Sequence, residues 1–168
     1  MEYNREKAVA YAHQWAYGRN PRYFDFTGIG GDCTNFASQC VFAGAGVMNY
    51  KKTFGWYYVN ANDRTPSWTG VQYFYNFIVN NKGPGPYAEV VPLSDIMPGD
   101  LVQLQYPGRT HWSHTPFVVE VGKHPAPDNI LIAAHTFDTD YRPLASYTYA
   151  NLRPLHIIGV RAPAEKAK

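Results

Sequence analysis

The spacing of apolar and polar residues changes once along the chain, from a helical period to the alternation typical of strands. Apolar side chains recur at helical spacing over residues 4–18, from Cys33 to about Gly44, and from Val71 to Ile78, where Ser67 or Thr69 could cap the helix. Further along, short apolar runs bounded by turn residues predict strands at residues 101–105, 114–121, 130–135 and 157–161. Helices followed by antiparallel strands are typical of an α+β fold, and we expect one domain over residues 1–168.

Composition narrows the class of partner. Charged residues make up 17% of the chain and aromatic residues 16%, which indicates a folded, aromatic-rich domain. The net charge is +2 with scattered basic residues, so we expect no nucleic-acid partner, although an anionic cell wall would not be repelled. No apolar run is long enough to span a membrane, and a secreted or cell-wall location would require a signal peptide outside this segment. Nothing in the sequence indicates an oligomeric state.

One cysteine stands at a glycine turn where a helix is predicted to begin. Cys33 follows a Gly-Gly-Asp run, residues 30–32, and precedes apolar side chains at helical spacing. The free N–H groups and the dipole of such a helix would face the sulfur, so we expect the pKa of this thiol to fall below its usual ~8.5. A buried structural cysteine is the commoner case, but the glycines and the adjacent acid favour a nucleophile.

The second cysteine is predicted to be structural. Cys40 lies seven positions after Cys33 on the same predicted helix, which separates them by about 10 Å along its axis. A disulfide needs Cα atoms closer than about 7 Å, so the two should not pair, and Cys40 is most simply a small core residue. The chain also lacks the paired-cysteine spacing of a metal site, and we expect neither a metal nor a cofactor.

A nucleophilic cysteine needs a base and a group that orients the base. His114 lies at the mouth of a predicted strand and is the candidate base. His135 ends the next predicted strand, and antiparallel pairing would bring it near His114, where it could fix the tautomer of the base. Asp138 competes for this role, because a carboxylate would hold an imidazolium more strongly. We expect His135 to be the third residue.

The site also needs donors for the oxyanion and contacts for the substrate. The backbone N–H of Cys33 is one candidate donor, and Tyr23, ten positions earlier, is a second. Asp32 either contacts substrate or caps the helix, with Asn35 bonding across the turn. The predicted substrate-binding residues are therefore Tyr23, Asp32 and Trp112.

These residues resemble a known family. The run over residues 31–40, the turn at residues 98–101 and the later His114 resemble the papain-like NlpC and CHAP superfamily of cell-wall amidases and peptidases. The bacterial putative amidase domain family is the most similar group, because its members share that run and three short segments, which are residues 3–5, 67–70 and 135–136.

The resemblance implies a papain-like α+β fold, in which N-terminal helices pack on an antiparallel sheet. It implies Cys33 as nucleophile, His114 as base and His135 as the third polar residue, and Tyr23 resembles the tyrosine that precedes the Asp-Cys pair in the NlpC group. One departure is that Thr34-Asn35 replaces the Ser-Gly usual after the NlpC cysteine, and the third catalytic position differs among these groups.

Two classes of function are compatible with these residues. The leading hypothesis is a cysteine amidase or peptidase that hydrolyses amide bonds, such as those of peptidoglycan peptides, through an acyl-enzyme. Transfer of the acyl group to an amine would use the same site. The alternative is a carbohydrate- or peptide-binding module without catalysis, whose stacking surface would comprise Trp56, Tyr57, Tyr58, Trp68 and Trp112.

Overall fold

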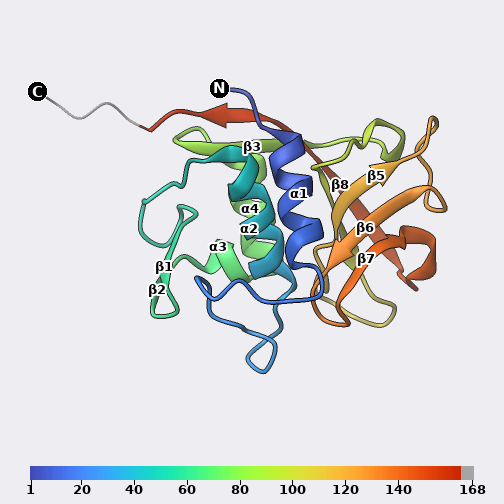
Figure 1. Cartoon of the computed structure of the whole chain (residues 1–168), viewed down its shortest axis with the longest axis horizontal. Helices are drawn as coiled ribbons and strands as arrows, with labels where there is room; N and C mark the ends of the chain where they lie inside the picture. Colours follow the sequence, from blue (N-terminus) through green and yellow to red (C-terminus); the bar gives the residue numbers. More distant parts are fainter. Residues whose placement is uncertain (164–168) are drawn as a thin grey trace, which may run out of the picture.

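The computed structural model, which describes residues 1–163, gathers helices against one face of a twisted antiparallel sheet (Figure 1). The helices are α1 (Arg5–Trp15), α2 (Cys33–Ala45), α3 (Pro66–Thr69) and α4 (Val71–Asn80). A small hairpin stands apart from the main sheet and consists of β1 (Tyr58–Asn60) and β2 (Asp63–Arg64). The predicted α+β class is confirmed. Within the described residues, no helix has the length and apolar character needed to span a membrane.

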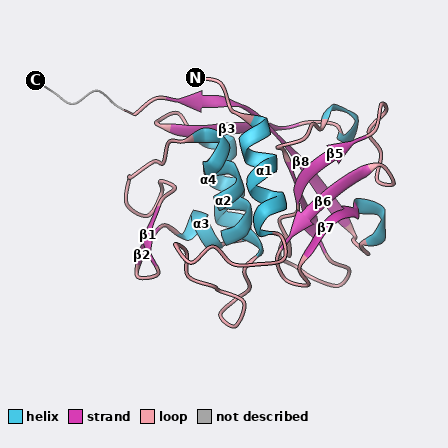
Figure 2. Cartoon of the chain, in the orientation of Figure 1, coloured by secondary structure: helices cyan, strands magenta, loops and turns pink. Residues whose placement is uncertain are grey.

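The main sheet has six strands in the order β3-β8-β4-β5-β6-β7, all antiparallel to their neighbours (Figure 2). Its strands are β3 (Gly85–Val90), β4 (Leu101–Gln105), β5 (Phe117–Val121), β6 (Ile130–Ala134), β7 (Thr139–Pro143) and β8 (Asn151–Arg161). Two 3₁₀ turns, η1 (Leu93–Asp95) and η2 (Leu144–Ser146), join strands. The sequence pattern missed β3 and β7, which are edge strands whose exposed residues lack a clear apolar alternation.

The third predicted helix is α4, whose N-cap is Gly70 rather than Ser67 or Thr69, and the short helix α3 before it was not predicted. Gly70 has an extended backbone, with φ −113° and ψ 130°, and its N–H closes α3 on the carbonyl of Pro66. Its own carbonyl accepts the first bond of α4 from Phe74. The apolar stripe from Val71 to Ile78 located α4, whereas the four residues of α3 are too few to show a helical period.

Helix α2 is the centre of the helical layer. Ten of its 13 residues are buried, so it has no solvent-facing stripe. Helix α1 approaches it closely at Gly44, where a Cβ atom would come within 2.6 Å of the Asn4 carbonyl oxygen. Helix α2 ends at Gly46, which adopts a left-handed φ of 69° and donates its N–H to the Phe42 carbonyl.

The alternation of side chains along the strands divides the apolar residues between two cores, one on each face of the sheet. On β5, Phe117 packs toward the helices, whereas Val118 packs on the opposite face.

The Pro-Gly-Asp turn of the resemblance is a structural junction. Asp100 is fully buried and accepts hydrogen bonds from the Arg5 guanidinium at 2.8 Å and from the Ile157 backbone N–H at 2.9 Å. His156 lies 2.9 Å from its other carboxylate oxygen. One buried carboxylate thereby joins the start of α1 to β4 and β8, which fixes the helical layer on the sheet.

Cys40 belongs to the core, as predicted, because it is fully buried in the cluster between the helices and the sheet. We expect Cys40→Ser to lower the free energy of unfolding by about 1–3 kcal/mol, since the hydroxyl would be buried in apolar surroundings. Urea denaturation of the purified variant measures this change. A Cys40→Ser protein as stable as the wild type would show that the site supplies a partner for the hydroxyl.

Candidate active site

Cys33 opens helix α2, as the glycine turn predicted. Gly30 and Gly31 adopt positive φ values of 80° and 94°, which lets the chain turn sharply into the helix. Asp32 occupies the N-cap position, but its side chain makes no capping bond to the helix. The prediction that the Asp32 side chain caps the helix is therefore wrong, and the first N–H groups of the helix are left for other partners.

The thiol of Cys33 lies between its own helix and the segment that leads into β5. The backbone N–H groups of Thr34 and Thr115 lie close enough to the sulfur to lower the pKa of the thiol, and the Thr34 hydroxyl lies 3.8 Å from it. The hydroxyls of Thr34 and Thr115 are 3.0 Å apart. These contacts join the start of α2 to the residue that follows His114, while Cys33 itself keeps partial exposure to solvent.

The electrostatics of this thiol differ from the sequence expectation. Burial raises the pKa of Cys33 above its usual value, and the negative charge of Asp32 raises it further. Together these two effects outweigh the hydrogen bonds from Thr34 and Thr115, which lower the pKa. The expected depression of the thiol pKa is therefore wrong. At neutral pH the thiol is protonated, so a nucleophilic role requires a base that removes its proton during the reaction.

His114 has the properties of such a base. Its side chain is almost completely buried, with 3% exposure, and its ring lies beside Tyr106 and Tyr147 at centroid distances of 6.3 and 5.5 Å. Burial, assisted by the positive charge of Arg142, lowers the pKa of His114 from 6.5 to about 4. The imidazole is therefore neutral at physiological pH and free to accept a proton.

The two tyrosines also place the His114 ring close to Cys33. Burial is the main cause of the raised pKa values of Tyr106 and Tyr147, and a negative charge at Cys33 contributes to both. The sulfur and the His114 ring therefore share these neighbours. Since Thr115 also touches the sulfur, the structure gathers Cys33 and His114 in one region.

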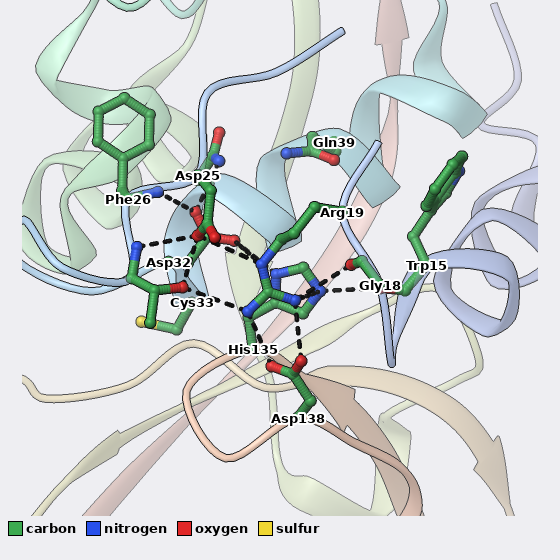
Figure 3. Close-up of polar contacts among 12 residues, drawn as sticks. Trp15, Gly18, Arg19, Asp25, Phe26, Asp32, Cys33, Gln39, His135 and Asp138 are labelled. Carbon is green, nitrogen blue, oxygen red and sulfur yellow. Dashed lines mark hydrogen bonds and ion pairs between the residues drawn. The ribbon is translucent and has the colours of Figure 1, made fainter. Parts of the chain in front are cut away.

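His135 is engaged elsewhere. Its Nδ1 lies 2.5 Å from an Asp32 carboxylate oxygen, and its Nε2 lies 2.9 Å from the Trp15 carbonyl oxygen (Figure 3). The ring stacks on Phe36 at 4.0 Å, under the helices, whereas the tyrosines around His114 pack on the other face of the sheet. The structure thus corrects the predicted role of His135, because adjacent strand positions alternate between faces and both ring nitrogens are occupied.

Asp138 does not take that role either. Both of its carboxylate oxygens accept from the Arg19 guanidinium, at 2.9 and 3.0 Å. Arg19 also forms an ion pair with Asp25 at 3.2 Å. In Figure 3, Arg19 lies between the two acids and His135, and the Cys33 side chain points away from Arg19. Arg19 was not predicted as a site residue, because it lies in a loop with no motif around it. This network fixes the loop between α1 and α2, which forms one border of the site.

The predicted substrate-binding residues have different fates. Asp32 is fully buried and accepts from the Phe26 N–H and the Asn35 amide as well as pairing with His135, so it is not available to a substrate. The bond from Asn35 across the turn is as expected. Tyr23 is part of an aromatic cluster, with its ring 6.0 Å from that of Trp68, and no hydrogen bond joins it to Cys33 within residues 1–163.

Trp112 remains a candidate for contact with a substrate. It is half-buried just before His114, and the Arg153 guanidinium lies 4.1 Å from its ring centre. The remaining residues of the predicted stacking surface are buried. Trp56 and Trp68 have no exposed area, and Tyr57 and Tyr58 are 8% exposed. The alternative hypothesis of a binding surface built from these aromatic residues is therefore wrong, because four of the five side chains pack in the core.

No group of three or more His, Cys, Asp or Glu side chains among residues 1–163 is arranged to hold a metal ion. The chemistry available at this place is that of a thiol, an imidazole and the backbone N–H groups of a helix start.

Comparisons with known proteins agree with the general chemistry. A family model described as a putative amidase domain matches residues 2–158. The uncharacterized protein YhbB of Bacillus subtilis (strain 168) is 32% identical over 144 residues, which cover 84% of this chain and 44% of that protein. The chain therefore spans less than half the length of this relative. No solved structure matches the chain.

Proposed function

The chain belongs to the putative amidase domain family, and we propose that it hydrolyses amide bonds with Cys33 as the nucleophile and His114 as the base. The observation that carries the proposal is the meeting of the α2 start, where Cys33 lies, with the segment that holds His114, through the contacts of Thr34 and Thr115. A cysteine at a helix start, packed against an antiparallel sheet that bears a histidine, also supports a papain-like arrangement.

The protonation states favour general-base activation over a preformed ion pair. The raised pKa of Cys33 keeps the thiol protonated, and the lowered pKa of His114 keeps the imidazole neutral. As the sulfur attacks the carbonyl carbon, the S–H proton passes to His114. The negative charge that develops on the carbonyl oxygen is stabilised by N–H groups at the start of α2, of which the Cys33 N–H is the nearest by sequence.

The rest of the cycle follows from the same two residues. His114 returns the proton to the leaving nitrogen, the C–N bond breaks, and an amine leaves a thioester on Cys33. Water then attacks the thioester carbon while His114 takes a proton from it. Breakdown of the second tetrahedral species releases a carboxylic acid, and the proton goes back to the sulfur.

We propose peptide amides of peptidoglycan as the substrate. Two features support this class: the sequence resemblance to cell-wall amidases and peptidases, and a net charge of +2, which does not oppose binding to an anionic wall. Trp112, with Arg153 over its ring, lies on the His114 side and is suited to hold an amide-bearing chain by stacking and hydrogen bonding.

Digestion of purified peptidoglycan tests this function. We expect new amino and carboxyl termini, identified by mass spectrometry, and no new reducing ends of the glycan. The lowered pKa of His114 sets the pH dependence, because the base works only when unprotonated: kcat/KM should persist below pH 6.5 and decline as pH approaches about 4.

Two results would contradict the proposal. One is the absence of new amide-derived termini from peptidoglycan and from a panel of acyl amides. The other is an acid limb near pH 6.5, which would mean that His114 is not the base. Products that carry an added amine in place of water would identify acyl transfer at the same site.

A further inference from the structure

Two buried polar atoms beside the candidate site have no hydrogen-bond partner within residues 1–163. They are Nε2 of His114 and the hydroxyl oxygen of Tyr147. Buried polar groups are nearly always paired, and an unpaired one destabilises the folded state. Two such atoms on rings whose centres are 5.5 Å apart indicate a hydrogen bond that forms in another state of the site.

Both rings have well-defined backbone positions. His114 forms an isolated bridge with Leu104, in which the His114 N–H donates at 3.2 Å and its carbonyl accepts at 3.0 Å. Tyr147 follows η2 and donates its N–H to the Leu144 carbonyl at 3.1 Å. The Arg142 guanidinium lies 3.6 Å from the centre of the Tyr147 ring and is itself bound to the Ser146 hydroxyl at 2.7 Å. Tyr147 is therefore held beside His114 by its backbone and by Arg142.

The chemistry of the base requires a partner at this nitrogen. For Nδ1 of His114 to take the thiol proton, it must carry a lone pair, so the ring proton must sit on Nε2. That N–H then needs an acceptor, both in the neutral ring and in the imidazolium. The charged and titratable groups around His114 are Tyr106 after β4, Arg142 from β7 and Tyr147 after η2, and Cys33 from α2 lies within electrostatic range of both tyrosines. The Arg142 cation cannot accept, and the buried, unpaired hydroxyl in this set is that of Tyr147.

We propose that Tyr147 is the positioning residue of the active site: its hydroxyl accepts a hydrogen bond from Nε2–H of His114 and thereby holds the tautomer that deprotonates Cys33. This inference rests on the proposed function for its catalytic consequence. It gives Tyr147 the role for which the sequence suggested His135 and Asp138. A neutral hydroxyl also suits a place next to Arg142, where it accepts from the base without forming a competing ion pair with the guanidinium.

The test is the substitution Tyr147→Phe, which removes the hydroxyl and keeps the ring. We expect kcat to fall on the order of 10–100-fold, as for loss of a hydrogen bond to a charged group, with KM little changed. Long-range ¹H–¹⁵N spectra of the histidine rings give a second readout, because they distinguish Nε2–H from Nδ1–H. We expect His114 to carry its proton on Nε2 in the wild type and to shift toward Nδ1–H in the variant.

Tyr149→Phe is the matched control, since it removes one tyrosine hydroxyl from the same segment, and it should leave kcat and the His114 spectrum unchanged. The proposal is overturned if Tyr147→Phe retains wild-type kcat and tautomer, or if Tyr106→Phe produces these effects in its place. The spectra do not depend on turnover. Failure of the wild type to hydrolyse amides would therefore defeat the proposed function while the spectra still decide the Tyr147–His114 pair.

Discussion

Cys33→Ser is expected to lower kcat for amide hydrolysis by on the order of 10⁴-fold, because the proposed nucleophile is lost and His114 has no thiol to deprotonate. The free energy of unfolding should change by less than about 0.5 kcal/mol, since serine has nearly the same shape and its hydroxyl can bond the Thr34 and Thr115 groups that contact the sulfur. Rates on a chromogenic acyl amide and urea denaturation of the same preparation measure the two quantities.

The Cys33 and Cys40 variants form a matched pair. Both remove one sulfur from α2, but we expect a loss of activity at position 33 and a loss of stability at position 40. Near-wild-type hydrolysis by Cys33→Ser would reject the nucleophile. Alkylation with iodoacetamide is a poorer test, since burial raises the pKa of Cys33 and a slow reaction at neutral pH is expected even from an active enzyme.

Asp32→Ala is expected to destabilise the fold by about 3–5 kcal/mol, because it leaves the buried His135 without the carboxylate that lies 2.5 Å from its Nδ1. The same carboxylate accepts from the Phe26 N–H and the Asn35 amide, so the turn before Cys33 loses its anchor as well. At roughly 2–4 °C per kcal/mol, Tm should fall by about 6–20 °C. Differential scanning calorimetry measures the shift.

Asp138→Ala serves as the control, because it removes a carboxylate from the same network at a more exposed position. The Asp138 side chain is 31% exposed, and loss of its pair with Arg19 should cost about 0–1 kcal/mol. Equal losses from the two variants would show that the Asp32–His135 pair is not the structural anchor. A large fall in kcat with unchanged Tm for His135→Ala would restore His135 to the catalytic site.

The pairing of a protonated thiol with a neutral imidazole has a structural origin. Both groups are largely shielded from water, which disfavours their charged forms. For Cys33 this effect outweighs the N–H groups of Thr34 and Thr115, and for His114 the nearby Arg142 cation adds to it. In the proposed mechanism, charge therefore develops only when the substrate carbonyl is attacked.

The sequence by itself determined the features whose signals are local. The glycine turn and the apolar spacing after it located the start of α2 at Cys33, and the seven-residue separation assigned Cys40 to the core. The change of period predicted the α+β class, and it placed His114 near a strand, although β5 begins at Phe117 and His114 forms an isolated bridge with Leu104. These inferences succeed because turn geometry and periodicity act over a few neighbouring residues.

Only the tertiary structure decided which side chains meet. His135 pairs with Asp32, which is 103 positions away in the chain, and Asp138 binds Arg19, 119 positions away. Pairing between strands alternates faces at each residue, so a shift of one position decides whether His135 meets His114 or the helices. The pKa directions also depend on burial, which results from the packing of the whole chain rather than from the residues beside Cys33.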